Sequence, residues 1–152
     1  MHIALKEAIK ASINNEVPVG TVIVHKGEVV SQNHNLVRKN IDPTAHAEIL
    51  CIRDVAQKLG SCYLNECEIY VTLEPCAMCA QAIAFSKLKR LYFGAYDEKF
   101  GAIENGIRFF SSNTVSHVPE IYGGLEQAKA SRILQEFFKK MRNAKLKSAF
   151  YS

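Results

Sequence analysis

Two short stretches of the sequence hold residues that can bind a metal ion and move protons. His46-Ala47-Glu48 places an imidazole two residues before a carboxylate, and Pro75-Cys76-Ala77-Met78-Cys79 places two thiols three residues apart. Residues three apart on a helix face the same way, so Cys76 and Cys79 can reach one metal ion. Taken alone, a Cys-x-x-Cys pair is equally compatible with a redox pair or with half of a structural zinc site.

His46 favours a catalytic zinc ion over these alternatives. With the two cysteines it supplies three protein ligands, and a catalytic zinc keeps its fourth position open for water, whereas a structural zinc is closed by four protein ligands. Cys51 follows His46 by about a turn and a half of helix and is expected to point elsewhere. Cys62 and Cys67 lie near the start of the predicted strand at 68–73, the end far from Pro75, and are expected to lie away from the Pro75 turn. The sequence therefore predicts an open site with three protein ligands.

Glu48 is the candidate for proton transfer at this site. Zinc lowers the pKa of a bound water to about 7, and deamination needs a group that takes a proton from the water and protonates the ring and the departing ammonia. Residues two apart on a regular helix do not share a face. We therefore expect His46 at the irregular start of its helix, where an extended backbone can turn both side chains toward the metal. Alone, Glu48 would more simply be a first-turn carboxylate that stabilises the helix dipole.

The hydrophobic pattern predicts helices and strands that alternate along the chain. The expected order is a helix at 2–14, a hairpin of strands at 21–24 and 28–33, a helix at 44–59, a strand at 68–73, a helix at 75–86, a strand at 90–95, a loop with short pieces at 97–119, and an amphipathic helix from 125 to about 145. Strands separated by helices imply a mixed sheet with helices on both faces.

Length and composition indicate an ordinary globular protein. The 152 residues suit one domain, 1–152. No apolar stretch approaches the roughly 20 residues of a membrane span, and the first residues lack a signal-peptide pattern. We therefore expect a cytoplasmic protein that does not use a membrane, whose five cysteines are thiols or metal ligands. The segment 139–147 holds five basic residues and no acidic one, which fits nucleic-acid binding and a solvated helix end equally well.

The pattern His-x-Glu followed by Pro-Cys-x-x-Cys is similar to the signature of the zinc-dependent cytidine and adenosine deaminases. Longer stretches resemble the bacterial tRNA-specific adenosine deaminases, namely Glu16–Gly20, Asp42–Glu48, Val71–Cys79 and Phe93–Ala102. The resemblance extends from Glu16 to about Arg142. It implies a three-layer α/β/α fold of the cytidine-deaminase type, with a five-stranded mixed sheet flanked by helices. It also implies a homodimer with active sites near the subunit interface, and one Zn²⁺ per subunit.

The same resemblance implies a reaction and a substrate. The reaction is hydrolytic deamination of adenosine to inosine at the wobble position of a tRNA, by a zinc-activated water and a glutamate proton shuttle. The substrate is the anticodon stem-loop of an arginine tRNA, with the adenosine flipped into the pocket. In this assignment His46, Cys76 and Cys79 bind zinc, and Glu48 is the proton shuttle.

The resemblance further assigns contacts with the flipped base. Asn35 matches an asparagine that hydrogen-bonds the purine, and Val17 and Leu73 match apolar walls of the pocket. The backbone N–H groups around Ala47 and Cys76 are expected near the base.

Other matching positions are expected to contact the RNA outside the base. Asp97 matches an aspartate that meets the sugar of a flanking nucleotide, and Lys99 and Arg108 can supply cations for phosphates. Phe137 and Phe138 match aromatic residues of the last helix near the RNA. Packing in the core is an equally good explanation for one of these two.

Three alternatives share part of this pattern. A guanine deaminase that acts on the free base would carry His46–Glu48 and Cys76–Cys79, but not Glu16–Gly20 or Phe93–Ala102. Cytidine and deoxycytidylate deaminases fit less well. A non-catalytic zinc module is disfavoured by Glu48, since a structural site has no use for a proton shuttle. Departures from the family pattern fall around the expected RNA-facing surface, at Phe85, Tyr96, Ser116-His117 and the segment Ile103–Phe110.

Overall fold

The computed structural model describes the backbone of residues 1–150 and the side chains of residues 1–144. The helices are α1 (His2–Ile13), α2 (Val37–Asn40), α3 (Ala47–Leu59), α4 (Ala77–Phe85) and α5 (Gln127–Phe150), with a 3₁₀ turn η1 (Phe109–Ser111). The strands are β1 (Gly20–His25), β2 (Glu28–His34), β3 (Cys67–Leu73), β4 (Arg90–Ala95) and β5 (Glu120–Tyr122).

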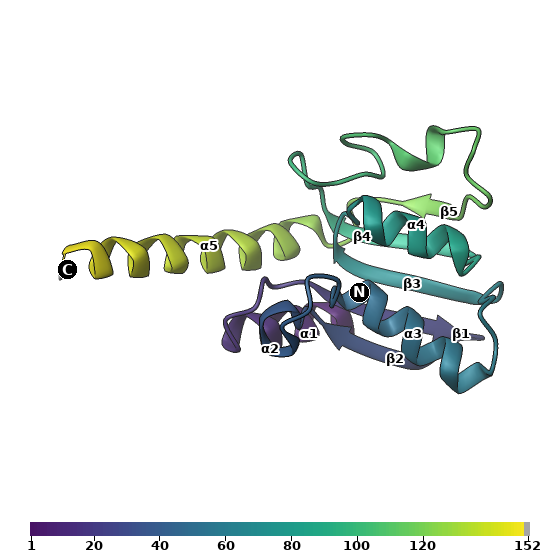
Figure 1. The fold of residues 1–152 in the computed structure, drawn as a ribbon, viewed down its shortest axis with the longest axis horizontal. Helices are drawn as coiled ribbons and strands as arrows, with labels where there is room; N and C mark the ends of the chain where they lie inside the picture. The colour runs from purple at the N-terminus through teal and green to yellow at the C-terminus, as the bar shows by residue number, and fades with distance from the viewer. Residues whose placement is uncertain (151–152) are drawn as a thin grey trace.

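The five strands form one mixed sheet in the order β2-β1-β3-β4-β5. β1 runs antiparallel to both β2 and β3, whereas β3, β4 and β5 are parallel. Helices α3 and α4 cover one face of the sheet, and α1 and the first part of α5 cover the other (Figure 1). The expected three-layer α/β/α arrangement is therefore confirmed. No helix in the described part of the chain is both long enough and apolar enough to span a membrane.

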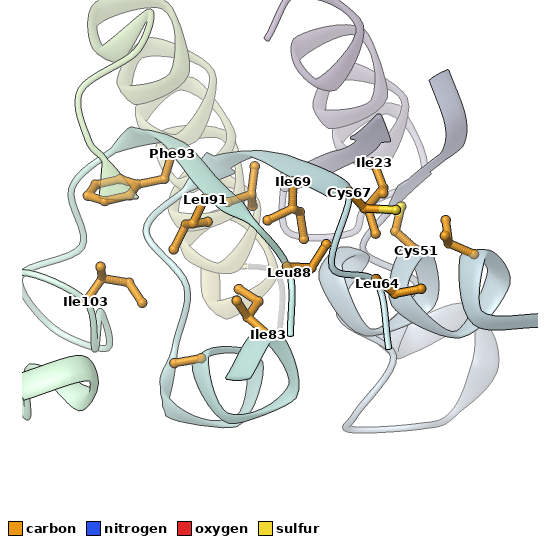
Figure 2. Packing of buried hydrophobic residues seen from close by; sticks show 13 residues of the cluster. Ile23, Cys51, Leu64, Cys67, Ile69, Ile83, Leu88, Leu91, Phe93 and Ile103 are labelled. Carbon is orange, nitrogen blue, oxygen red and sulfur yellow. The ribbon is translucent and has the colours of Figure 1, made fainter. Parts of the chain in front are cut away.

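The larger core lies between the sheet and the helices α3 and α4. In Figure 2, Ile69 of β3 and Leu91 of β4 lie on the side of the sheet that faces Ile83 of α4, and all three are fully buried. Val55 of α3 joins the same cluster. Successive side chains of a strand point to opposite faces of the sheet, so every second residue of β3 and β4 faces the two helices. The apolar residues at these positions pack against α3 and α4, which carry the candidate site, and hold them in place.

A smaller apolar cluster fixes α1 and α5 on the opposite face. Leu5 of α1, Ala95 of β4 and Ala130 of α5 are buried together, and Leu73 and Leu134 pack against them. Beyond this contact α5 extends away from the sheet (Figure 1). The side chains of the basic segment are described as far as residue 144, so those of Lys145 and Lys147 lie outside the described residues.

Three helices begin later than the sequence predicted. Helix α3 starts at Ala47 instead of Thr44, because the Asp42 carboxylate accepts hydrogen bonds from the Thr44 N–H (2.8 Å) and hydroxyl (2.7 Å). These bonds close a turn at Asp42-Pro43-Thr44, which the sequence pattern does not distinguish from a helix start. Helix α4 likewise starts at Ala77 instead of Pro75, and helix α5 starts at Gln127 instead of Leu125.

Two short elements lie where no local pattern predicted a helix or strand. Helix α2 has four residues, and strand β5 has three. β5 is defined by its pairing with β4, in which Arg90 lies opposite Glu120 and Tyr92 opposite Tyr122. A strand this short owes its existence to its neighbour in the sheet, so hydrophobic alternation does not reveal it.

Gly20 permits the close packing of α1 on β1, and the Gly20→Ala variant is expected to be strongly destabilised. A Cβ atom there would lie 2.0 Å from the Ala4 carbonyl oxygen and 2.5 Å from the Ala8 nitrogen, both backbone atoms of α1. We expect the free energy of unfolding to fall by about 3 kcal/mol. Gly27→Ala is the control: its φ of +86° is unfavourable for alanine but nothing lies within 4 Å, so a loss of only about 1 kcal/mol is expected. Equal losses in urea unfolding would contradict the steric explanation.

Candidate active site

The candidate site lies where α3 and α4 begin, beside the carboxyl end of β3. His46 is the N-cap residue of α3 with φ −69° and ψ 149°, and Cys76 is the N-cap residue of α4 with φ −73° and ψ 173°. Both backbones are extended, which confirms the expected irregular start at His46. Glu48 and Cys79 follow in the first turns of the two helices. The four side chains can therefore converge although a regular helix would separate His46 from Glu48.

The imidazole and the two thiols form a compact group. Nδ1 of His46 lies 3.5 Å from the Cys79 sulfur and 3.7 Å from the Cys76 sulfur. All three atoms lie within 4.8 Å of one another, and this is the one such group of three metal-binding side chains found among the described residues. The three residues predicted as metal ligands are thus brought together.

The other cysteines point elsewhere, as expected. The Cys51 thiol is buried against β1, where it donates a hydrogen bond to the Thr21 carbonyl oxygen (3.4 Å). Cys62 is exposed, and Cys67 is buried at the first residue of β3. The group therefore has three protein ligands, the number typical of a catalytic zinc site.

The chemistry of the group fits a divalent cation. The Cys79 thiol donates a hydrogen bond to Cys76, and with the contribution of His46 this lowers the pKa of Cys76 to about 4 against the opposing effect of burial. The pKa of Cys79 is raised, because the same bond and burial favour its protonated form. The contact with Cys76 raises the pKa of His46. Zinc prefers thiolate and imidazole ligands and would replace the protons that these three groups share.

Glu48 lies beside this group and is buried, with 3% of its surface exposed. Burial raises the pKa of its carboxyl group. Within the described part of the chain, its Oε2 atom is a buried oxygen with no hydrogen-bond partner. Such an atom is costly in a folded protein unless it serves a ligand or a reacting group, so this orphaned oxygen also fits a metal and substrate site.

A cavity of about 970 Å³ opens over the cluster. Its size is at the upper end of the roughly 300–1,000 Å³ of small-molecule sites. The lining comes from five parts of the chain: Glu16, Val17, Val19, Asn35, Val37, Arg38, Pro43, His46, Glu48, Leu73, Glu74, Cys76, Tyr96, Asp97, Glu98, Lys99, Phe100, Leu134 and Phe138. Most of the predicted substrate-binding residues are in this set, namely Val17, Asn35, Leu73, Asp97, Lys99 and Phe138.

Ala47 and Phe137 are not among the lining residues. Ala47 is fully buried at the start of α3, beside His46, and Phe137 is 4% exposed. Phe138, in contrast, is 47% exposed and lines the cavity, with its ring centre 5.4 Å from that of Phe137. Of the two aromatic residues, Phe137 therefore packs inside the protein and Phe138 faces the cavity.

Sequence reasoning missed several residues of the cavity wall. The Glu16 carboxylate is buried and accepts hydrogen bonds from the Asn35 side-chain amide (3.0 Å) and the Lys39 N–H (2.8 Å), so it fixes the orientation of Asn35. Glu16 begins one of the stretches that carry the family resemblance, which was a usable signal. Phe100 lies in another such stretch, Phe93–Ala102, and had the same signal. Arg38 had none, since only the packing of distant segments brings it to the cavity.

Three of the departures from the family pattern, at Phe85, Tyr96 and Ser116, lie in different surroundings. Tyr96 lines the cavity and makes an edge-to-face contact with Phe93, at 5.1 Å between ring centres. Phe85 is exposed at the end of α4, and Ser116 precedes His117, whose Nε2 lies 2.7 Å from the Leu88 carbonyl oxygen. Among the three, Tyr96 is the one that meets the cavity.

A three-layer α/β/α fold with a His, Cys, Cys and Glu cluster at two helix starts is the pattern of the nucleobase deaminases. Residues 1–142 match the model of the MafB19-like deaminase family. The chain is 47% identical over 142 residues to the tRNA-specific adenosine deaminase of Agrobacterium fabrum, which covers 93% of each protein. It belongs to the family of tRNA-specific adenosine deaminases.

Solved structures agree with this assignment. A tRNA:A34 deaminase, studied for A-to-I editing at the wobble position of transfer RNA, superimposes with a TM-score of 0.87 and 48% identity, over 88% of this chain and 97% of that one. The guanine deaminase of Nitrosomonas europaea superimposes with a TM-score of 0.77 but only 19% identity, over 90% and 81% of the two chains. At that identity the likeness concerns the fold alone.

Proposed function

We propose that this protein deaminates adenosine to inosine at the wobble position of a tRNA, and that the substrate is an arginine tRNA recognised through its anticodon stem-loop. The observation that carries the proposal is that the metal-binding cluster opens into a cavity walled by both apolar and charged residues. Val17 and Leu73 offer apolar surface for a base, while Arg38 and Lys99 offer cations for phosphates. A site for a free base has no need of cations that bind phosphates.

His46, Cys76 and Cys79 would hold a zinc ion, one in each subunit. Bound there, zinc supplies a Lewis acid that lowers the pKa of a water to about 7. The two helix starts hold the three ligand atoms in place, because each ligand residue is either an N-cap or in the first turn. The burial of Cys79 keeps bulk water away from this side of the group.

Glu48 performs the proton transfers in this mechanism. Its free Oε2 atom takes a proton from the attacking water, whose oxygen forms a bond to C6 of adenine, and delivers a proton to ring nitrogen N1. It then takes the second proton from the hydroxyl group now bonded to C6 and passes it to the amino group, so that the C6=O bond forms as the C6–N bond breaks and ammonia leaves. Asn35, oriented by Glu16, contacts the purine from the cavity wall, and Asp97 contacts a flanking sugar.

The resemblance to the tRNA deaminases supports two further expectations. We propose that the protein is a homodimer with its active sites near the subunit interface, which light scattering in solution will test as a mass of twice 17.0 kDa. We also propose that it acts in the cytoplasm, together with its tRNA substrate.

Substrate choice tests the proposed function directly. The zinc-loaded protein is incubated with an arginine anticodon stem-loop carrying adenosine at the wobble position, and in parallel with free guanine and with cytidine. We expect inosine in the stem-loop and no ammonia from the other two. Release of ammonia from guanine alone would preserve the mechanism but assign the protein to the guanine deaminases.

Alanine substitutions at the adjacent residues Phe137 and Phe138 are expected to affect different properties, stability at Phe137 and substrate binding at Phe138. Phe138→Ala removes a cavity-facing ring and is expected to raise KM for the stem-loop about tenfold, the effect of losing one base–aromatic stack. Phe137→Ala leaves a buried cavity and is expected to lower the free energy of unfolding by about 3 kcal/mol. Steady-state kinetics and urea unfolding of both variants provide the comparison, and equal effects in either measurement would refute the assignment.

A further inference from the structure

A buried carboxylate outside the cluster organises one wall of the cavity. Glu74 lies between β3 and α4 and is 2% exposed. Its Oε1 atom accepts hydrogen bonds from the backbone N–H groups of Ile103 (3.1 Å), Glu104 (2.8 Å) and Asn105 (2.9 Å). Its Oε2 atom accepts from the Asp97 N–H (3.0 Å) and the Asn105 side-chain amide (2.6 Å). All five donors belong to residues 97–105, here called the Glu74 loop.

The Glu74 loop is wrapped closely around this carboxylate. At Gly101 an added Cβ atom would lie 2.6 Å from the Glu74 carboxyl carbon and 2.4 Å from the Asp97 carbonyl oxygen, so the loop approaches to a distance that only glycine allows. Gly101 also forms a β-bridge with Cys76, and the Ala102 N–H donates to the Pro75 carbonyl oxygen (2.9 Å). The loop is therefore tied to the turn that carries the first cysteine.

The first part of the Glu74 loop faces the cavity. Asp97, Lys99 and Phe100 all line it, and the Asp97 carboxylate accepts hydrogen bonds from the N–H groups of Lys99 and Phe100, at 3.0 Å each. The Asp97 backbone is in turn held by Glu74. A displacement of the Glu74 carboxylate would consequently move the residues proposed to meet the flanking sugar and phosphates.

Negative charge is the property of Glu74 that this arrangement requires. Consecutive backbone N–H groups that converge on one point form an anion-binding site. Three such groups meet one carboxylate oxygen and two donors meet the other, so both arms must act as acceptors. A glutamine has the same shape but only one accepting arm, and its amide group would face N–H donors at the other.

We infer that Glu74 is a positioning residue for substrate recognition: it holds the Glu74 loop in the conformation that presents Asp97, Lys99 and Phe100 to the RNA. This inference rests on the proposed function for the identity of the substrate. The contact between Glu74 and the loop does not depend on it.

The Glu74→Gln variant tests the inference in the zinc-loaded protein. We expect the amides of Asp97 and residues 103–105 to exchange hydrogen about tenfold faster or more, while amides of β3 and β4 keep their protection. For the wobble-adenosine stem-loop we expect KM to rise about tenfold and kcat to stay within about threefold. Zinc content should equal that of the parent. Asn105→Ala, which removes a single donor, is expected to give a smaller change in the same direction.

Glu68→Gln is the matched control, since Glu68 lies on β3 at the end far from Glu74 and pairs with Arg90 (2.6 Å) instead of the loop. Unchanged exchange in Glu74→Gln would overturn the inference, as would faster exchange with an unchanged KM. Loss of zinc would assign Glu74 to the metal cluster instead and would also overturn it. A parent protein that leaves the stem-loop unmodified overturns the proposed function, and the exchange measurement, which needs no RNA, still decides whether Glu74 holds the loop.

Discussion

The Glu48→Ala variant is expected to lose deamination activity while it keeps its fold and its metal. General acid–base catalysis contributes about 10²–10⁴-fold to a rate. Glu48 is proposed to make every proton transfer, so we expect kcat to decrease by a factor at the upper end of that range, about 10⁴-fold. Stability is expected to change little, because the variant removes a buried oxygen that has no partner within the described residues. Ammonia release from the wobble-adenosine stem-loop measures the rate. Zinc content shows whether the metal is kept, and thermal unfolding shows whether the stability is kept.

Two further variants separate proton transfer from a change of shape. Glu48→Gln keeps the size of the side chain but cannot take up a proton, and it is expected to be as inactive as Glu48→Ala. Asp54→Ala removes a carboxylate from the same helix, where Asp54 pairs with Lys58 at 2.8 Å, and is expected to keep the parent rate. A Glu48→Ala protein with a near-normal rate would show that another group transfers the protons.

The Cys79→Ser variant is expected to lose both zinc and activity. Cys79 is fully buried, and its sulfur lies 3.5 Å from Nδ1 of His46. Mutating groups that merely support metal ligands weakens metal binding about 10–100-fold, so loss of a thiolate ligand should exceed that range. Because a ligand that binds only the folded state stabilises it, zinc should raise the Tm of the parent protein but leave that of Cys79→Ser unchanged.

Cys62→Ser is the control for the loss of a thiol. Cys62 is exposed and lies outside the cluster, so this variant is expected to keep the zinc content and the Tm response of the parent. His46→Ala is expected to behave like Cys79→Ser. Zinc content equal to that of the parent in either cluster variant, measured after dialysis against a chelator, would remove that residue from the set of ligands.

Spacing along the chain was sufficient to predict a candidate metal site with a carboxylate beside it. His46, Glu48, Cys76 and Cys79 were found from residue types a few positions apart, and their convergence in one cluster agrees with that prediction. The reason is that each pair lies at one helix start, where backbone geometry is set by residues within a turn. The alternation of helices and strands was predictable for the same reason, since the core positions of Ile69 and Leu91 repeat with the period of a strand.

The wall of the cavity was decided by tertiary structure. Arg38, Phe100 and Glu74 reach it only because the fold brings α2, the Glu74 loop and the turn after β3 to the border of one cavity, and no periodic pattern in the sequence encodes that neighbourhood. Phe137 and Phe138 are adjacent in the sequence, yet the direction of α5 buries one and turns the other toward the cavity. The sequence by itself thus determined which candidate reactive groups stand at the two helix starts. Sheet order and helix packing, which join residues far apart in the chain, decided what surrounds them.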